Sequence, residues 1–177
     1  MTEETLELVE PCAELELAYL EFLAESDERQ HPYLGCRDEV AGDFAGFVRK
    51  QRDMSAGRGL PDGWVPATTY WLVADGRVIL GSINLRHRLT PALEDYGGHV
   101  GYIVRPSARG RGYGTRMLTM ALQKAREMGL TGVLITCDPK NVASTRMIRK
   151  HAGRLLSESP AKTGKAGRMT SRYWIDL

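Results

Sequence analysis

The stretch from Val104 to Thr115 holds residues whose types and spacing suit the binding of an anion. It reads Val-Arg-Pro-Ser-Ala-Arg-Gly-Arg-Gly-Tyr-Gly-Thr, with glycine at every second position from Gly110 to Gly114. Glycine permits a tight turn and lets a ligand approach main-chain N–H groups. An apolar run ends at Pro106 and an amphipathic segment follows the glycines, so the stretch joins a strand to a helix. A helix start adds unpaired N–H donors and the positive end of the helix dipole, and the combination predicts a phosphate site.

The charges around this stretch agree with an anionic ligand. Between Tyr96 and Arg126 there is no Asp or Glu, whereas six basic residues occur: Arg105, Arg109, Arg111, Arg116, Lys124 and Arg126. A charge-assisted hydrogen bond to a phosphate contributes about 1.5–3 kcal/mol, so a pyrophosphate suits the loop. The GxGxxG spacing and its downstream acidic residue are absent, and no Lys follows Gly114 as it would in GxxxxGK[ST]. These absences disfavour nicotinamide and nucleoside triphosphate ligands.

The elements next to this stretch must position it. We predict a strand over His99–Val104 and the clearest helix of the chain over Gly112–Met128. The apolar stripe of that helix contains Met117, Leu118, Ala121, Leu122 and Ala125. Gly129 is expected to end the helix, Val133–Thr136 reads as a buried strand, and Asn141 opens a further helix that ends near Gly153.

The remaining elements complete a mixed α/β pattern. A strand over Leu6–Val9, helices over Glu14–Glu28 and Glu39–Met54, and a loop over Gly57–Pro66 are predicted at the front. Asp75-Gly76 is a strong hairpin signal between strands over Thr69–Val73 and Val78–Leu85, and a last strand lies around Tyr173–Ile175. The order predicts an α/β domain with one parallel crossover between Val100 and Ile135.

Composition narrows the classes of protein. The chain has 177 residues, 42% hydrophobic and 26% charged, which favours one folded domain over residues 1–177. A net charge of 24 − 22 = +2 is too small to make nucleic acid the default partner. No apolar run of about 18 residues suggests a membrane span, and the acidic start lacks signal-peptide features, so we expect a cytoplasmic protein. Cys12, Cys36 and Cys137 form no CxxC pair, so we expect reduced thiols and no metal site.

Arg109-Gly-Arg-Gly-Tyr-Gly114 resembles the Arg/Gln-x-x-Gly-x-Gly/Ala motif of the GNAT superfamily of N-acetyltransferases. His99-Val-Gly-Tyr-Ile-Val-Arg-Pro106 resembles the strand that precedes this motif, and the segment from Asn141 to Gly153 resembles the family's Asn-led helix. The closing Tyr-Trp-Ile is similar to that of a bacterial group of predicted acetyltransferases. The resemblance implies a mixed sheet whose two central parallel strands splay apart, with coenzyme A held along them. The cofactor-binding residues that it implies are Ile103, Val104, Arg109, Gly110, Arg111, Gly112, Tyr113, Gly114, Thr115, Asn141 and Ser144.

Direct transfer to an amine requires a base, because an alkylammonium with a pKa of about 10.4 is almost wholly charged at neutral pH. His99 is the first candidate, since it begins the strand where many family members carry a Glu. A structural hydrogen-bonded histidine is the alternative reading of the same residue. Glu94 and Asp95 are rival bases, and His87 is expected to be solvated or to face the substrate.

The acid that protonates the departing thiolate is harder to place. Many family members have a Tyr seven residues after the motif Asn, but Ile148 stands there in this chain. Ser144, three residues after Asn141, matches the serine that other members use. Its hydroxyl could instead bond to the helix backbone, and water could supply the proton.

Other side chains near the implied site have ordinary explanations. Cys137 is expected to be an inert thiol rather than an acyl carrier, and Tyr102 and Tyr113 fit core packing as well as cofactor contact. The loop bearing Trp64 should line the acceptor side. The basic residues of the late loop, Lys162, Lys165 and Arg168, either steer an acidic acceptor or are solvated.

The implied function is acetyl-CoA-dependent N-acetyltransfer to a primary amine by direct attack. The amine could belong to a peptide N-terminus, an amino acid, a polyamine-like metabolite or an aminoglycoside-like compound. A non-catalytic acyl-CoA-binding module and a basic nucleic-acid binder are the rival classes, and no membrane partner is expected. A homodimer is left open.

Overall fold

The computed structural model describes residues 4–27 and 31–177. A four-stranded antiparallel sheet has the order β1-β2-β3-β4, in which β1 is Leu6–Val9, β2 Ala67–Ala74, β3 Val78–Arg86 and β4 Val100–Val104. The tight hairpin between β2 and β3 is confirmed: Asp75 and Gly76 have φ of 48° and 66°, the left-handed pair that a two-residue hairpin turn requires.

A second, three-stranded sheet has the order β5-β7-β6, with antiparallel pairing throughout. Its strands are β5 Gly132–Cys137, β6 Arg154–Pro160 and β7 Met169–Asp176. The strands β4 and β5 belong to different sheets, and all ladders of the described residues are antiparallel. The expected parallel pairing across the crossover is therefore not present as a ladder.

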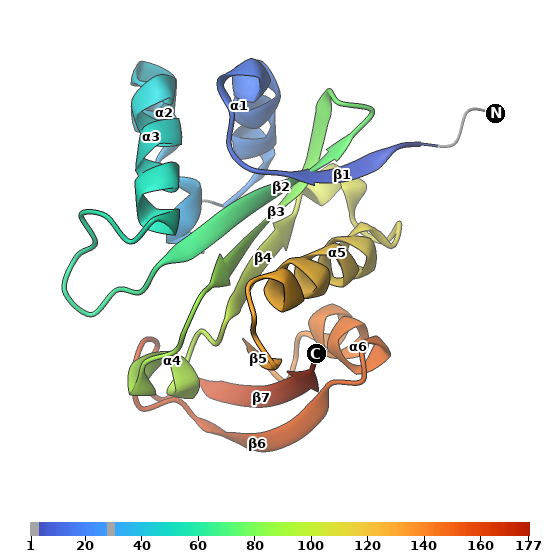
Figure 1. Cartoon of the computed structure of the whole chain (residues 1–177). Helices are drawn as coiled ribbons and strands as arrows, with labels where there is room; N and C mark the ends of the chain where they lie inside the picture. Colours follow the sequence, from blue (N-terminus) through green and yellow to red (C-terminus); the bar gives the residue numbers. More distant parts are fainter. Residues whose placement is uncertain (1–3, 28–30) are drawn as a thin grey trace.

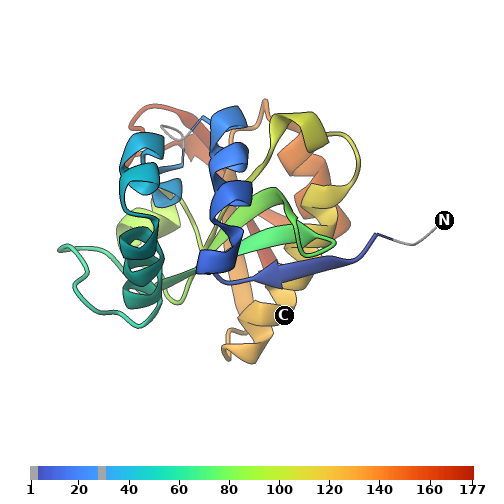
Figure 2. The same cartoon turned by 90° about the horizontal axis from the view of Figure 1, so that it is seen from above.

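Helices cover both faces of the first sheet (Figure 1). The helices α1 Glu16–Glu25, α2 Arg37–Gly42 and α3 Phe44–Ser55 lie on one face, and α5 Tyr113–Glu127 lies on the other. Figure 2 shows α1 beside α2 and α3 from above. The shorter elements are η1 Ala13–Leu15, η3 Pro32–Leu34, α4 Pro91–Asp95, η4 Pro106–Ala108 and α6 Val142–Lys150.

Alternation along the strands divides the core in two. On β2, Trp71 and Val73 pack with α1–α3, while Tyr70 and Leu72 pack toward α5. Trp71 is fully buried and stacks on Tyr19, with 4.3 Å between the ring centroids. One sheet therefore supports two hydrophobic layers, which fix β3 and β4 from both sides.

The helix α5 confirms the predicted apolar stripe, whose five residues are at most 5% exposed. It starts after Gly112, with φ of 83°, and stops at Gly129, with φ of 82°. Burial of the stripe anchors the helix under the sheet, so the start of α5 is held rigidly beside the end of β4.

The predicted front helices differ in detail. The segment over Glu14–Glu28 forms η1 and α1, and Glu28 lies outside the described residues. The single helix expected over Glu39–Met54 is two helices, α2 and α3, because Asp43 leaves the helical conformation and caps α3 by accepting from Gly46 N at 2.8 Å. Within residues 4–27 and 31–177, no helix is long and apolar enough to cross a membrane.

Candidate active site

Hydrogen bonds at His99 hold the start of β4 to β5. The His99 N–H donates to the Leu134 carbonyl at 2.7 Å, and the Leu134 N–H donates to His99 Nδ1 at 2.9 Å. Gly98 lies so close to this joint that a Cβ there would be 2.4 Å from the Leu134 oxygen. Beyond the joint, β4 has no ladder to β5 among the described strands.

The pairing of β4 with β3 shows which main-chain groups lie on the unpaired edge of β4. His99 O accepts from Arg86 N at 2.8 Å and Arg105 N donates to Leu80 O at 2.9 Å, so the odd-numbered residues bond toward β3. Because main-chain groups alternate along a strand, those of Tyr102 and Val104 point to the β5 side. The sequence-based choice of Ile103 as a main-chain partner of the cofactor is therefore not supported, whereas Val104 lies on the expected edge.

The start of α5 carries a run of unused donors. The main-chain N–H groups from Gly110 to Thr115, six in succession, make no hydrogen bond to any described residue. A Cβ added at Gly110 or Gly112 would meet nothing within 4 Å. Gly114 has another role, because its added Cβ would lie 3.3 Å from Met147 Sδ, where α5 packs on α6. The predicted anion loop is thus exposed, with its nitrogens free of protein oxygens.

The side chains of this loop have distinct roles. Arg105 is committed to Glu25, whose pKa it holds at about 2, so Arg105 belongs to the scaffold. Arg109 Nε donates to Val104 O at 3.0 Å. Arg111 lies over the Tyr113 ring at 5.2 Å.

Tyr113 itself packs in the core, and its hydroxyl donates to Glu4 at 2.9 Å. Its side chain is therefore structural, and only its main-chain N–H is left for an anion.

The helix α6 starts at the motif asparagine. Asn141 Oδ1 accepts from Ser144 N at 3.1 Å and caps the helix. Ser144 is 8% exposed and Ile148 is fully buried. In the part of the chain that is described, no hydrogen bond joins Ser144 Oγ to the helix backbone.

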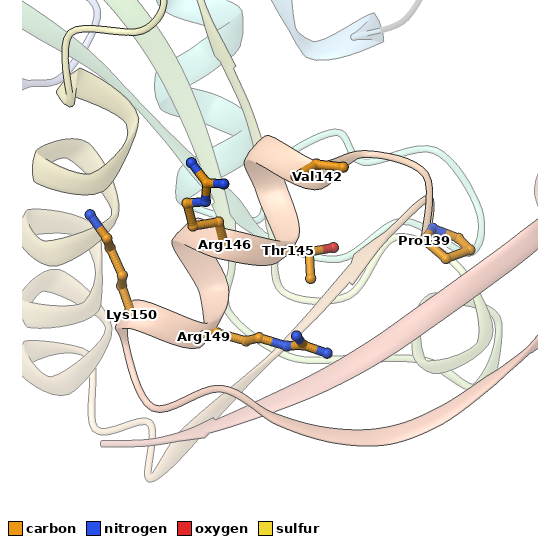
Figure 3. A pocket seen from close by; sticks show the side chains of 6 residues that line it. All are labelled: Pro139, Val142, Thr145, Arg146, Arg149 and Lys150. Carbon is orange, nitrogen blue, oxygen red and sulfur yellow. The ribbon is translucent and has the colours of Figure 1, made fainter.

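The outer side of α6 borders an open hollow of about 530 Å³ (Figure 3). Its lining residues are Pro139, Val142, Thr145, Arg146, Arg149 and Lys150. Arg146 and Lys150 extend toward α5, and Arg149 extends toward the strands of the second sheet. The hollow adds positive charge on the α6 side of the anion loop.

The candidate bases occupy very different surroundings. His99 is 6% exposed, and burial lowers its pKa to about 4, with the nearby Arg86 cation as a second cause. Its Nδ1 already accepts a hydrogen bond, so the neutral ring carries its proton on Nε2 and has no free lone pair. This geometry corresponds to the structural alternative and not to a base.

Of the other candidate bases, Asp95 and His87 have hydrogen-bond partners and Glu94 is exposed. Asp95 accepts from the main-chain N–H groups of Lys162 and Thr163 and pairs with Arg172 at 2.8 Å, which hold its pKa at about 2. His87 bonds Thr68 at 2.8 Å. Glu94 is exposed on α4 and is the acidic candidate left without a structural bond among the described residues.

Tyr102 is a residue that the sequence did not single out for chemistry. Its hydroxyl is buried and has no hydrogen-bond partner in the described part of the chain. Burial raises its pKa to about 12, opposed by the Ser144 hydroxyl, while Cys137 adds to the rise. The side chain therefore extends from β4 to the end of β5 and the start of α6. A Gly-Tyr pair in the predicted strand was the available signal, but packing explained it equally well.

Cys137 behaves as expected of an inert thiol. Its Sγ lies 3.8 Å from Thr145 Oγ1, and burial raises its pKa. A raised pKa lowers the fraction of thiolate, which is the nucleophilic form. The described residues include no cluster of three or more metal-binding side chains.

A family model for the acetyltransferase (GNAT) domain matches residues 7–153. The match spans the strand, loop and helices described above, and the chain belongs to the GNAT acetyltransferase family. No curated protein sequence is significantly similar to it.

Solved structures share the fold at low sequence identity. A GNAT-family acetyltransferase from Bacillus anthracis has a TM-score of 0.64 and 19% identity, covering 97% of this chain and 94% of its own. RimL, a ribosomal L7/L12 α-N-protein acetyltransferase in complex with coenzyme A, has a TM-score of 0.66 and 14% identity, covering 98% and 94%. MccE, a microcin C7 self-immunity acetyltransferase in complex with acetyl-CoA and AMP, has a TM-score of 0.63 and 12% identity, covering 97% and 92%.

Proposed function

We propose that this chain is an N-acetyltransferase that moves the acetyl group of acetyl-CoA directly to a primary amine, with the whole chain forming one domain. The observation that carries the proposal is the run of six free main-chain N–H groups from Gly110 to Thr115 at the start of α5. Such a run suits a pyrophosphate, because both the donors and the helix dipole favour an anion.

The residues present fit acetyl-CoA beyond the phosphates. The main-chain groups of Tyr102 and the N–H of Val104 offer the pantetheine amides the bonds that an added strand would make, whereas Val104 O already accepts from Arg109 Nε. Arg146 and Lys150 in the hollow beside α6 add cations for the phosphate of acetyl-CoA that is not part of the pyrophosphate. When bound, acetyl-CoA supplies an activated acetyl thioester.

Residues of the chain then donate and accept the protons that the transfer requires. Tyr102 stays protonated at neutral pH because its pKa is about 12, and we assign it the proton that the departing sulfur takes. The Ser144 hydroxyl lies close enough to oppose the rise in the pKa of this group. The amine loses its proton to Glu94 or to water, since His99 has no free lone pair.

We propose a primary amine as the acceptor. RimL acts on a ribosomal protein N-terminus according to its name, which supports an amine acceptor in general. The rival, a non-catalytic acyl-CoA-binding module, is motivated by Ile148 in place of the family's tyrosine. Thiol release with an amine separates the two, because the rival binds acetyl-CoA without releasing thiol.

Calorimetry with acetyl-CoA tests the binding half of the proposal. Gly112→Glu should abolish binding, because it places a carboxylate and a Cβ among the free N–H groups. Gly129→Glu is the matched control, since Gly129 has nearly the same φ, 82° against 83°, equal free space, and lies at the other end of α5. Equal binding by both variants and the unmodified chain would remove the loop from the site.

A further inference from the structure

Arg86, the last residue of β3, carries a half-buried cation that pairs with no carboxylate of the described residues. Its Nη1 donates to the carbonyls of Gly97 at 3.1 Å and Gly98 at 2.9 Å. Among the described residues, no carboxylate lies within ion-pair distance, and Nε and Nη2 make no hydrogen bond. Burial lowers the pKa of its guanidinium. Three of the five N–H donors of the group are therefore unused.

Among the described residues, the other two arginines that are not exposed, Arg105 and Arg172, are neutralised. Arg105 pairs with Glu25, and Arg172 pairs with Asp95 at 2.8 Å. A buried charge without a counter-charge is costly, so a guanidinium that faces no carboxylate in residues 4–27 and 31–177 requires a reason. A ligand that brings its own anion supplies one.

The position of Arg86 relates it to the reacting end of the site. Asn84 lies opposite Gly101 in the β3–β4 register. A Cβ on Gly101 would be 4.0 Å from Arg86 Nη2 and 3.4 Å from the Tyr33 ring. Arg86 therefore lies over β4 on the face covered by α1–α3, opposite the α5 face and one residue before Tyr102.

Charges of both signs lie around this face. Arg86 is close enough to His99 to lower the pKa of that ring. His31, whose ring contacts Tyr33 edge-on, has its pKa lowered by burial, and Lys165 and Arg109 add to the fall while Asp27 opposes it. Among these groups, the guanidinium of Arg86 is the one that would attract an anionic group of a ligand.

We propose, on the basis of the proposed function, that Arg86 binds a carboxylate of the amine acceptor, which makes the acceptor a small amino carboxylate. The guanidinium fork matches a carboxylate with two parallel hydrogen bonds. Arg86 lies near Gly101, and the acetyl group is placed by the proposed proton donor, Tyr102, one or two residues farther along β4. A strand rises about 3.4 Å per residue, so the guanidinium and the acetyl group would be some 3–7 Å apart along the strand. That separation suits α-, β- and γ-amino acids, in which a few bonds join the two groups.

Thiol release with matched amine pairs tests the proposal. The pairs are glycine and glycinamide, β-alanine and its amide, and 4-aminobutyrate and its amide, with spermidine and kanamycin as polycations. The free acid of at least one pair should exceed its amide about 30-fold in kcat/KM, and Arg86→Gln should reduce this preference to about threefold or less. Arg88→Gln, an exposed position two residues on, should leave it unchanged.

A binding experiment provides a readout besides activity. With acetyl-CoA present, propionate should shift the Nε–H NMR signal of Arg86 saturably; the signal is identified by its loss in Arg86→Gln, or in Arg86→Lys if the glutamine variant does not fold. A linear, unsaturable response would overturn the anion site.

The outcomes separate the two proposals. If amides or polycations had a kcat/KM as high as the free acids, the role of Arg86 would be refuted. Thiol release with these amines would still support the transferase. Loss of both acetyl-CoA binding and thiol release would refute the transferase, and the propionate titration would still decide whether Arg86 takes an anion.

Discussion

The hydrogen bonds between His99 and Leu134, which join β4 to β5, lead to a quantitative prediction about His99. Replacing His99 with alanine leaves the buried Leu134 N–H without the Nδ1 acceptor that now lies 2.9 Å away. An unsatisfied buried donor costs about 1–3 kcal/mol, and the space vacated by the ring adds to the loss. We expect His99→Ala to lower the free energy of unfolding by about 2–4 kcal/mol at pH 8.

Asparagine is the matched variant, because its Oδ1 lies two bonds from Cβ, as Nδ1 does in histidine. His99→Asn should keep the acceptor for Leu134 N–H and recover a large part of the stability lost in His99→Ala. It removes the edge contact with the Trp174 ring, 6.4 Å away between centroids, so recovery should be incomplete.

The same pair of variants gives a pH test. The pKa of His99 falls from 6.5 to about 4 on folding, so the unfolded chain binds the proton more tightly and stability is full above pH 6.5. Stability is lost as the pH falls from 6.5 toward 4. At pH 5 the loss is about 2 kcal/mol, from some 1.5 pKa units at 1.4 kcal/mol each, and less where solvent reaches the ring.

Urea unfolding at pH 8 and pH 5 measures both effects. The unmodified chain should lose more stability between these pH values than His99→Asn, which cannot titrate at this position. Equal destabilisation by Ala and Asn at pH 8, or equal pH slopes for the unmodified chain and Asn, would refute the account of the joint.

Variants at three further residues test other parts of the structure. Tyr102→Phe should lower kcat about 100-fold with little change in KM for acetyl-CoA, measured by thiol release; an unchanged kcat would leave the proton to Ser144 or water. Glu25→Gln should remove an acid-linked loss of stability, because the pKa of Glu25 is lowered from 4.5 to about 2 and its contribution, present above 4.5, disappears as the pH falls toward 2; thermal melting from pH 6 to pH 3 shows whether the variant and the unmodified chain converge. Asp43→Ala should cost about 1 kcal/mol through loss of the α3 cap, and Asp43→Ser should restore part of it in urea unfolding.

The sequence predicted the elements that depend on local patterning. The stripe of α5 and the Asp75-Gly76 hairpin follow from side-chain period and turn chemistry, and both are present. The break at Asp43 was missed because a short polar residue inside an apolar period also fits a continuous helix. Its capping bond to Gly46 N becomes evident only from the backbone geometry.

Roles that depend on contacts between distant elements could not be derived from the sequence. Nothing local indicates that Leu134 N–H donates to His99, 35 residues away, and this bond is what argues against a base. The difference between Ile103 and Tyr102 depends on which edge of β4 pairs with β3, a matter of register. Arg86 was passed over because an arginine at the end of a strand is commonly solvated, and only the structure shows that its charge has no described carboxylate partner.

A strand edge left unpaired inside a protein needs something to keep it open. Closing β4 onto β5 would gain main-chain hydrogen bonds, yet Gly98 and His99 confine the joint to one end, and the Tyr102 ring reaches across to the residues near Ser144. The two helical layers hold β3 and β4 from opposite faces, so β4 cannot tilt toward β5 without disrupting one of them. The open edge of β4 is therefore a consequence of packing on both faces of the sheet. The same packing holds this edge and the loop from Gly110 to Thr115 in one rigid unit. A single extended ligand can then make hydrogen bonds to the unused main-chain groups of both.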